Sequence, residues 1–328
     1  MRQLFWRFVL IVLAVAALVS GSINGEGFLE KYGCWQGPET RGYYLSYCQT
    51  RGYADFEHAA AWFNLEPGMA DSIRAAKVIA VGSSRIQIAL SLGDAPKWFH
   101  DHGIPFYMLG FGYDERSGFT SAVMQRIKAK PRIIIIDTWP FLSGGQSQMA
   151  DSVTSSNDSL IKAVKKMKFD EWHRSFCNKW KIICGITLAH YRSIEDGRWI
   201  FPTEKEPVYF GRDFLPHDDD AKPIRRSDKV TDPATFAAYL QTTKEFIRRS
   251  GVSPACVVLT MTPVSDEDFS LAPRLASAIG AVAIVPPSNG MTTFDNSHLT
   301  PHSARVWTSA LVTALGPVIS ACGLRESR

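Results

Sequence analysis

The sequence predicts an α/β protein whose β-sheet is parallel and covered by helices. Short apolar runs of strand length alternate with helical patterns along most of the chain, which is typical of strands joined by helices. The clearest run is Ile133–Ile136, because a strand buried on both faces needs no polar positions. The expected strands cover 77–81, 105–109, 133–136, 256–261 and 281–285, and the expected helices cover 84–92, 120–130, 232–249, 272–279 and 301–315.

Local signals support the boundaries of several of these elements. The strand at 77–81 is followed by Gly82, which lets the chain turn sharply toward a helix. Asp232 and Pro233 match an N-cap and the first residue of a helix. Gly251 suits the C-terminal cap of the same helix.

Composition and patterning divide the chain into regions. With 328 residues, of which 45% are hydrophobic and 21% charged, the chain is long enough for one large α/β domain with insertions or for two small domains. We assign 1–22 to a signal peptide or membrane anchor and 23–76 to an irregular N-terminal cap. The α/β domain spans 77–320, with a polar insertion at about 143–230 in which 180–186 is expected to add a strand. The net charge of +4 is small, and the basic residues form no stripe along the sequence, so no nucleic-acid partner is expected.

The N-terminal segment has the pattern of an export signal. Arg2 and Arg7 flank the start of an apolar run over 8–19, and small residues follow it. The run is short for a spanning helix, which needs roughly 20 residues, although an uncleaved anchor remains an alternative. A buried N-terminal helix is the other alternative. We expect an exported protein, periplasmic or extracellular, either secreted or tethered to the inner membrane.

The six cysteines agree with an oxidising compartment, where an even number favours disulfides. Cys34–Cys48 and Cys177–Cys184 are close enough in sequence to close small loops, which would leave Cys256–Cys322. Sequence alone allows other pairings, and six reduced core thiols are the alternative if the chain is not exported. No CxxC pair occurs, so no zinc or thioredoxin-like site is expected.

Ser84 is the first candidate for chemistry, because it follows the first strand of the α/β domain. In parallel sheets ligands bind at the carboxyl ends of the strands. A serine there begins a helix whose first amides are free to stabilise an oxyanion. A plain helix N-cap is the alternative role of this residue.

Asp295 and His298 stand three residues apart just before the last helix, a spacing that places both side chains on one side of a tight turn. A serine nucleophile needs a base to take its proton, and the base needs an acidic group to orient it. His298 and Asp295 suit these two roles. The alternative is a turn aspartate beside a solvated histidine.

Together, Gly82-Ser83-Ser84 after the first strand and Asp295-x-x-His298-Leu299 before the last helix resemble the SGNH/GDSL-like hydrolase superfamily. The resemblance covers roughly 77–142 and 232–316. It implies a three-layer, flavodoxin-like sheet and a catalytic triad of Ser84, Asp295 and His298, with no cofactor. In its Gly-Ser-Ser form of the nucleophile block, the chain is similar to SGNH-like bacterial envelope proteins that take part in alginate O-acetylation and teichoic-acid D-alanylation.

The same resemblance implies an oxyanion hole formed by the backbone amides of Ser84 and Gly112, with Gly110 and then Gly118 as alternatives. A turn that needs glycine is the structural alternative. The family's third block supplies an Asn after the next strand, whereas this chain has Asp137-Thr138-Trp139 there. One oxyanion donor is therefore missing or comes from elsewhere.

The expected function is a serine-dependent acyl ester hydrolase or O-acyltransferase whose substrate is an acyl ester or acylated carbohydrate, such as a cell-envelope polymer. Trp139 and Phe141 are candidates to line its pocket or to pack in the core. A weak or inactive SGNH-like envelope protein that binds glycan or a partner is the alternative, and a phosphate- or metal-dependent hydrolase is a more distant one.

Overall fold

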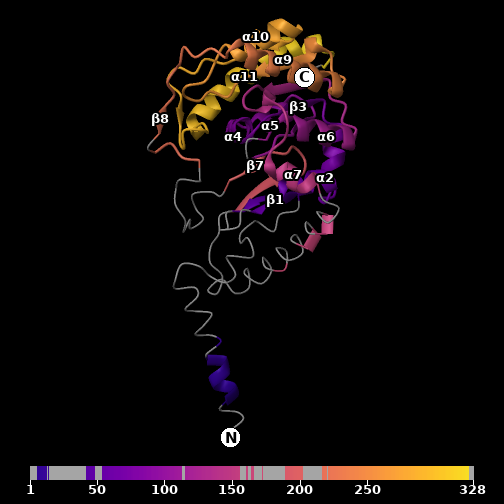
Figure 1. The fold of residues 1–328 in the computed structure, drawn as a ribbon, viewed down its shortest axis with the longest axis vertical. Coiled ribbons are helices and arrows are strands. Elements are labelled where there is room, and N and C mark those ends of the chain that lie inside the picture. Colours follow the sequence, from indigo (N-terminus) through magenta and orange to yellow (C-terminus); the bar gives the residue numbers. More distant parts are fainter. Residues whose placement is uncertain are drawn as a thin grey trace.

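A computed structural model provides the structure of the chain (Figure 1). It describes residues 6–12, 14, 42–48, 54–112, 115–155, 160, 161, 164, 165, 172, 189–201, 216–219 and 221–324.

The centre of the molecule is a parallel sheet of five strands in the order β10-β9-β5-β3-β4. The strands are β3 (Val78–Val81), β4 (Phe106–Met108), β5 (Ile133–Asp137), β9 (Val257–Thr260) and β10 (Val282–Ala283). Numbered by their sequence within this sheet, they run 2-1-3-4-5, which is the doubly wound order of flavodoxin-like folds. Every pairing is parallel. The predicted fold class is therefore confirmed at the level of the α/β layout, and each expected strand of the sheet is present.

Helices cover both faces of this sheet, which makes three layers. Alternate residues of each strand serve the two faces: Ile134 and Ile136 pack with one set of helices, and Ile133 and Ile135 with the other. One face carries α2 (Glu57–Phe63), α3 (Met69–Ala75), α6 (Ser117–Ile127), α9 (Pro233–Ser250) and α10 (Leu271–Ile279), and the other α4 (Ser84–Leu92), α5 (Ala95–Asp101) and α11 (Pro301–Ala321).

The caps predicted for α9 are confirmed. Asp232 accepts hydrogen bonds from the N–H groups of Ala234 and Thr235, and Gly251 ends the helix in the left-handed conformation at φ 71°. By contrast, α11 continues past its expected end at residue 315. It does so because Val318 and Ile319 extend its apolar face into the core.

The region before residue 77 is more regular than the sequence predicts. It contains β1 (Tyr43–Cys48), β2 (Ala54–Asp55), α2 and α3. Met69 and Ile73 of α3 are buried in the same core as the sheet, so α2 and α3 belong to the α/β body. The interpretation of 23–76 as an irregular cap is therefore wrong for the described residues 54–76, because helices of seven residues are too short to display a clear period.

The N-terminal region and the insertion build a second, antiparallel sheet together. Its order is β2-β1-β6-β7, with β6 at Ala189–Ser193 and β7 at Trp199–Ile200. Figure 1 shows β1 and β7 near each other at one end of the body. The remaining short elements are η1 (Phe141–Ser143), α7 (Gln148–Thr154), β8 (Lys222–Pro223), η3 (Pro254–Cys256) and β11 (Thr292–Thr293), which pairs with β8. The strand expected at 180–186 lies outside the described residues.

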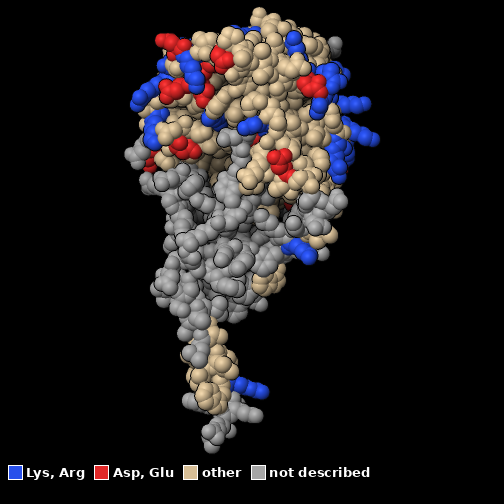
Figure 2. Space-filling view, in the orientation of Figure 1, with Lys and Arg blue, Asp and Glu red and all other residues tan. Residues whose placement is uncertain are grey.

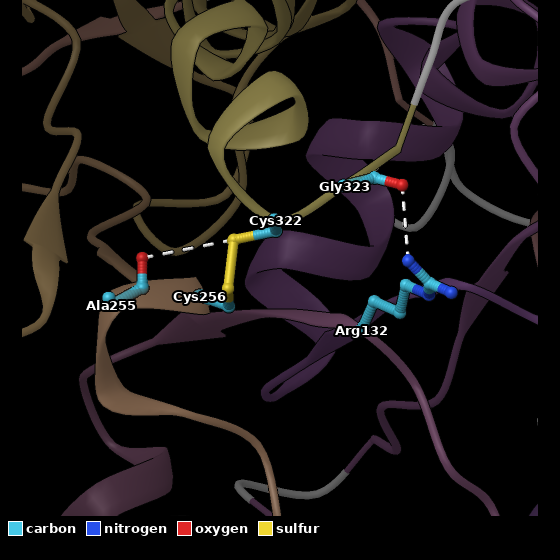
Figure 3. The surroundings of a disulfide bond; sticks show 5 residues. All are labelled: Arg132, Ala255, Cys256, Cys322 and Gly323. Atoms are coloured by element: carbon cyan, nitrogen blue, oxygen red, sulfur yellow. Dashed lines mark hydrogen bonds between the residues drawn. A yellow bond between two sulfur atoms is a disulfide. The ribbon is translucent and has the colours of Figure 1, made fainter.

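Cys256 and Cys322 form a disulfide, with an S–S distance of 2.07 Å (Figure 3). It joins the start of β9 to the end of α11. Beside it, Arg132 Nη1 donates a hydrogen bond to the carbonyl of Gly323 at 3.1 Å. This disulfide confirms one predicted pairing. The other two pairings involve residues outside the described part of the chain.

The N-terminal leader is described only in part. Residues 6–12 are helical, and most of 1–22 lies outside the described residues. Among the helices that the structure describes, none combines the length and apolar character needed to cross a bilayer.

On the face shown in Figure 2, charged side chains of both signs are interspersed over the described residues. Several cations stand in the last turns of helices, namely Arg74 in α3, Arg126 in α6, and Arg248 and Arg249 in α9. Cations there face the partial negative charge of the helix C-terminus. At these positions the basic residues stabilise the ends of their helices.

Candidate active site

The turn between β3 and α4 brings Ser84 to the carboxyl edge of the sheet. Gly82 makes this turn at φ 154°, and a Cβ at this position would lie 2.6 Å from Ile86 Cγ2 and 2.8 Å from Asp137 Cβ. No larger residue fits without a shift of the surrounding core. The Gly82 position thus lets β3 pass closely under α4 and present Ser84 as the first residue of the helix.

The neighbouring Ser83 acts as the N-cap of α4. Its backbone is extended, and its Oγ accepts the N–H of Arg85 at 3.4 Å. The alternative role of Ser84 as the helix cap is therefore wrong. Because Ser83 takes that role, the hydroxyl of Ser84 is available for another partner.

That partner is His298. Ser84 Oγ lies 2.9 Å from His298 Nε2, and His298 Nδ1 lies 2.6 Å from Asp295 Oδ2. The three side chains form a continuous hydrogen-bonded line, although Ser84 and His298 are 214 residues apart in sequence. The structure thus brings together all three residues that the sequence singles out.

A tight turn before α11 holds the acid and the base side by side. Asn296 adopts the left-handed conformation at φ 68°, which asparagine tolerates better than most residues. Asp295 Oδ1 accepts the N–H groups of Ser297 at 2.9 Å and of His298 at 2.7 Å. Asp295 therefore organises the backbone of the turn with one oxygen and orients the imidazole with the other.

Electrostatics favour an ionised Asp295. Its partial burial would raise its pKa, but the hydrogen bond and charge of His298 and the two backbone N–H groups outweigh burial and lower it. The side chains of His298 and Asp295 are 17% and 30% exposed, so a substrate can reach the site.

Burial, followed by the charge of nearby His298, lowers the pKa of His190 on β6 to about 4. His190 is therefore neutral at neutral pH.

The predicted oxyanion donor Gly112 is engaged elsewhere. Its N–H donates to Glu57 Oε1 at 2.5 Å, and the N–H of Gly118, a named alternative, donates to the carbonyl of Gly145 at 2.9 Å. The prediction for Gly112 is therefore not supported by this geometry. Within the described residues, the N–H groups of Ser84 and Gly110 have no acceptor, which leaves these two amides as the candidate oxyanion donors, although Gly110 itself is buried.

Asp137 occupies the end of β5, in the block where the superfamily that the sequence resembles has Asn. Its side chain is fully buried, and Oδ1 accepts the N–H of Thr262 at 2.9 Å. Burial raises the pKa of Asp137 to about 7, against the smaller lowering effects of the Thr262 N–H and the Arg85 charge. A buried carboxyl of this kind lies beneath the site and is not exposed to a substrate.

The two aromatic residues expected near the pocket, Trp139 and Phe141, lie in different environments. Phe141 is fully buried in the core beneath α9, so its pocket-lining role is wrong. Trp139 is half-buried, and the guanidinium of Arg85 lies 4.1 Å from its ring centroid. A second aromatic residue, Phe294, stacks near His298 with ring centroids 5.8 Å apart. It packs with Trp199 in a small apolar cluster beside the site.

Sequence reasoning missed Arg85, Gln87 and His190. Gln87 lies one helical turn after Ser84, and its carboxamide atoms are buried without a partner among the described residues. A Cβ on Gly110 would lie 2.8 Å from Gln87 Nε2. The spacing of three from Ser84 is a signal that points to Gln87. No sequence signal points to His190, because it comes from the second sheet.

The described residues contain no group of three or more His, Cys, Asp or Glu side chains suited to hold a metal ion. A scan against protein-family models finds no match to the chain, and searches of curated proteins and of solved structures find none either.

Proposed function

We propose that the protein is a serine-dependent acyl ester hydrolase or O-acyltransferase of the SGNH/GDSL-like type. The observation that carries the proposal is the line from Ser84 Oγ through His298 to Asp295, with distances of 2.9 and 2.6 Å. Both distances fall within the reach that a nucleophile, a base and an orienting acid need. The Gly-Ser-Ser and Asp-x-x-His blocks support the family assignment.

The chemistry follows from this order of groups. Ser84 Oγ attacks the acyl carbonyl carbon while its proton passes to His298 Nε2. The proposed donors to the resulting oxyanion are the N–H of Ser84, at the start of α4, and the N–H of Gly110, in the loop after β4. Collapse breaks the ester bond, and His298 returns the proton to the departing alcohol. An acyl group then remains on Ser84.

The second half of the reaction uses the same residues. His298 takes a proton from water or from a sugar hydroxyl, whose oxygen attacks the acyl-Ser84 carbonyl. Ser84 leaves with the proton from His298, and the product is a free acid or a new ester. We propose an acylated carbohydrate or cell-envelope polymer as the substrate. The Cys256–Cys322 disulfide and the leader pattern support an exported protein.

The experiment that tests this proposal is labelling with a fluorophosphonate probe, which forms a covalent bond with an activated serine. We expect the full chain to be labelled and Ser84→Ala to abolish the label. Ser309→Ala, which changes an exposed serine on α11, serves as the matched control and should label normally. Unchanged labelling of Ser84→Ala would remove Ser84 from the nucleophile role.

A second candidate function is binding without catalysis. Two observations favour it: the Gly112 amide is committed to Glu57, and Asp137 replaces the family's Asn. Loss of one oxyanion donor costs about 10²–10³ in rate. Absence of labelling and of acetate release from acetyl esters in the wild-type protein, together with measurable glycan binding, would favour this function over the hydrolase.

A further inference from the structure

Arg85, the residue after the candidate nucleophile, contacts three other loops at the carboxyl edge of the sheet. Its Nε donates to Ser297 Oγ at 3.3 Å. Its guanidinium carbon lies 4.1 Å from the centroid of the Trp139 ring, and Nη1 lies 3.8 Å from Glu267 Oε1. These loops precede α11 and follow β5 and β9. One side chain therefore connects three loops at the edge of the sheet where Ser84 lies.

The contact with Ser297 links Arg85 to the acid and base. Ser297 lies within the Asp295–His298 turn, and its own N–H donates to Asp295 Oδ1 at 2.9 Å. A line of hydrogen bonds thus runs from the first turn of α4 to the carboxylate that orients His298. The contact spans 212 residues of sequence, so it fixes two parts of the site that the chain itself does not hold together.

The surroundings of Arg85 hold its guanidinium in one place. The side chain is only 11% exposed, and its Glu267 partner is 14% exposed. Stacking on Trp139 restricts the plane of the guanidinium while Nε keeps its direction toward Ser297. A lysine has no planar group to stack and no Nε donor at this position, so it reproduces the charge but not the geometry.

We propose that Arg85 is a positioning residue, which sets the distance between Ser84 and His298 by tying the start of α4 to the Asp295–His298 turn through Ser297. The proposal rests on the proposed serine-dependent function. A different role, direct binding of an anionic group of the substrate, would place the effect of Arg85 on substrate affinity. Positioning places it on the steps in which His298 takes or returns a proton, and therefore on kcat.

The test is a double-mutant cycle in the full chain with p-nitrophenyl acetate as substrate. The variants are Arg85→Gln, Ser297→Ala and their combination. We expect each single change to lower kcat by about tenfold, as loss of one charge-assisted contact allows, with KM unchanged within about twofold. The combination should be no slower than Arg85→Gln alone, because both changes break the same link.

Two further variants sharpen the test. Arg85→Lys should restore less than half of the lost kcat, since it lacks the donor to Ser297. Arg248→Gln is the matched control, because Arg248 is also paired with a glutamate but lies in the last turn of α9, and it should keep the wild-type kcat. Thermal unfolding of each variant identifies substitutions that lower kcat only because the protein unfolds. If Arg85→Gln does not fold, Ser297→Ala alone still tests the link between Arg85 and the Asp295–His298 turn.

The outcomes separate this inference from the proposed function. If the wild-type protein is neither labelled by the fluorophosphonate nor active, the proposed function fails. If the wild-type protein is active but the two changes add independently, raise only KM or leave kcat unchanged, the positioning role of Arg85 alone is overturned.

Discussion

Replacing Asp295 by Asn tests the role of the acid with almost no change in shape. In the structure, Oδ1 accepts hydrogen bonds from two backbone N–H groups, and Oδ2 accepts one from the Nδ1–H of His298, with 2.6 Å between Oδ2 and Nδ1. An asparagine oxygen can keep the two backbone bonds. Its amide N–H₂ then faces Nδ1, and two donors cannot share one hydrogen bond. The imidazole must therefore present Nδ1 as an acceptor and carry its proton on Nε2.

The size of the effect follows from that change of tautomer. A protonated Nε2 donates to Ser84 Oγ and cannot take its proton, so the base is lost while the site remains assembled. The same substitution in serine proteases lowers kcat by about 10⁴. We expect a loss of about 10³–10⁴ in the rate of fluorophosphonate labelling for Asp295→Asn. The free energy of unfolding should change by no more than about 1 kcal/mol, because the turn keeps its backbone bonds.

The assay compares labelling rates of the wild-type protein, Asp295→Asn and Asp295→Ala across pH. Because the pKa of Asp295 is lowered in the folded protein, ionised Asp295 stabilises the fold above the unfolded-state pKa of about 4. This contribution of Asp295 to the free energy of unfolding is lost as the pH falls through the lowered pKa that Asp295 has in the folded protein. Asp295→Asn should lack this acid-dependent step in stability. Wild-type labelling rates in Asp295→Asn would refute the role given to the acid.

Three further predictions concern stability. Burial raises the pKa of Asp137 to about 7, so ionisation of its carboxyl lowers the stability of the fold as the pH rises from about 4 to about 7. Asp137→Asn removes this cost and should therefore raise Tm more at pH 8 than at pH 5. Equal shifts of Tm at both pH values would contradict this. The Cys256–Cys322 disulfide closes a sequence separation of 66, and replacing both cysteines by alanine should lower the free energy of unfolding by about 4 kcal/mol in urea titrations. The carboxamide of Gln87 is buried without a partner among the described residues, so Gln87→Met should raise the free energy of unfolding by about 1 kcal/mol, whereas a lower value would indicate a polar role.

The parts of the fold that sequence predicts are those encoded by local patterns. A strand buried on both faces must be apolar throughout, which is why Ile133–Ile136 identifies β5 without ambiguity. Caps are equally local, since Asp232 needs only the two amides that follow it. The meeting of Ser84 and His298 is not local, but the parallel sheet places the ends of its strands at one edge, and the two motifs lie at that edge.

Other features depend on contacts that no local pattern reveals. The amide of Gly112 is occupied by Glu57, which comes 55 residues earlier. On sequence, Glu57 is an ordinary acidic residue in the first turn of a short helix. Its burial against the end of β4 appears only when α2 packs on the sheet. The choice among the three candidate glycines therefore required the tertiary structure.

The buried ion pair of Glu57 and Arg192 is a second tertiary contact on which the geometry of the site depends. Their side chains are 2% and 1% exposed, and Arg192 also donates to the carbonyls of Met108 and Gly110. Buried ion pairs are seldom more stable than apolar residues of the same size, so stability alone gives little reason for this one. Its geometric effect is specific, because it joins β6 and α2 to the loop that follows β4. We infer that α2, which precedes residue 77, and β6, which lies in the insertion, shape the loop beside Ser84.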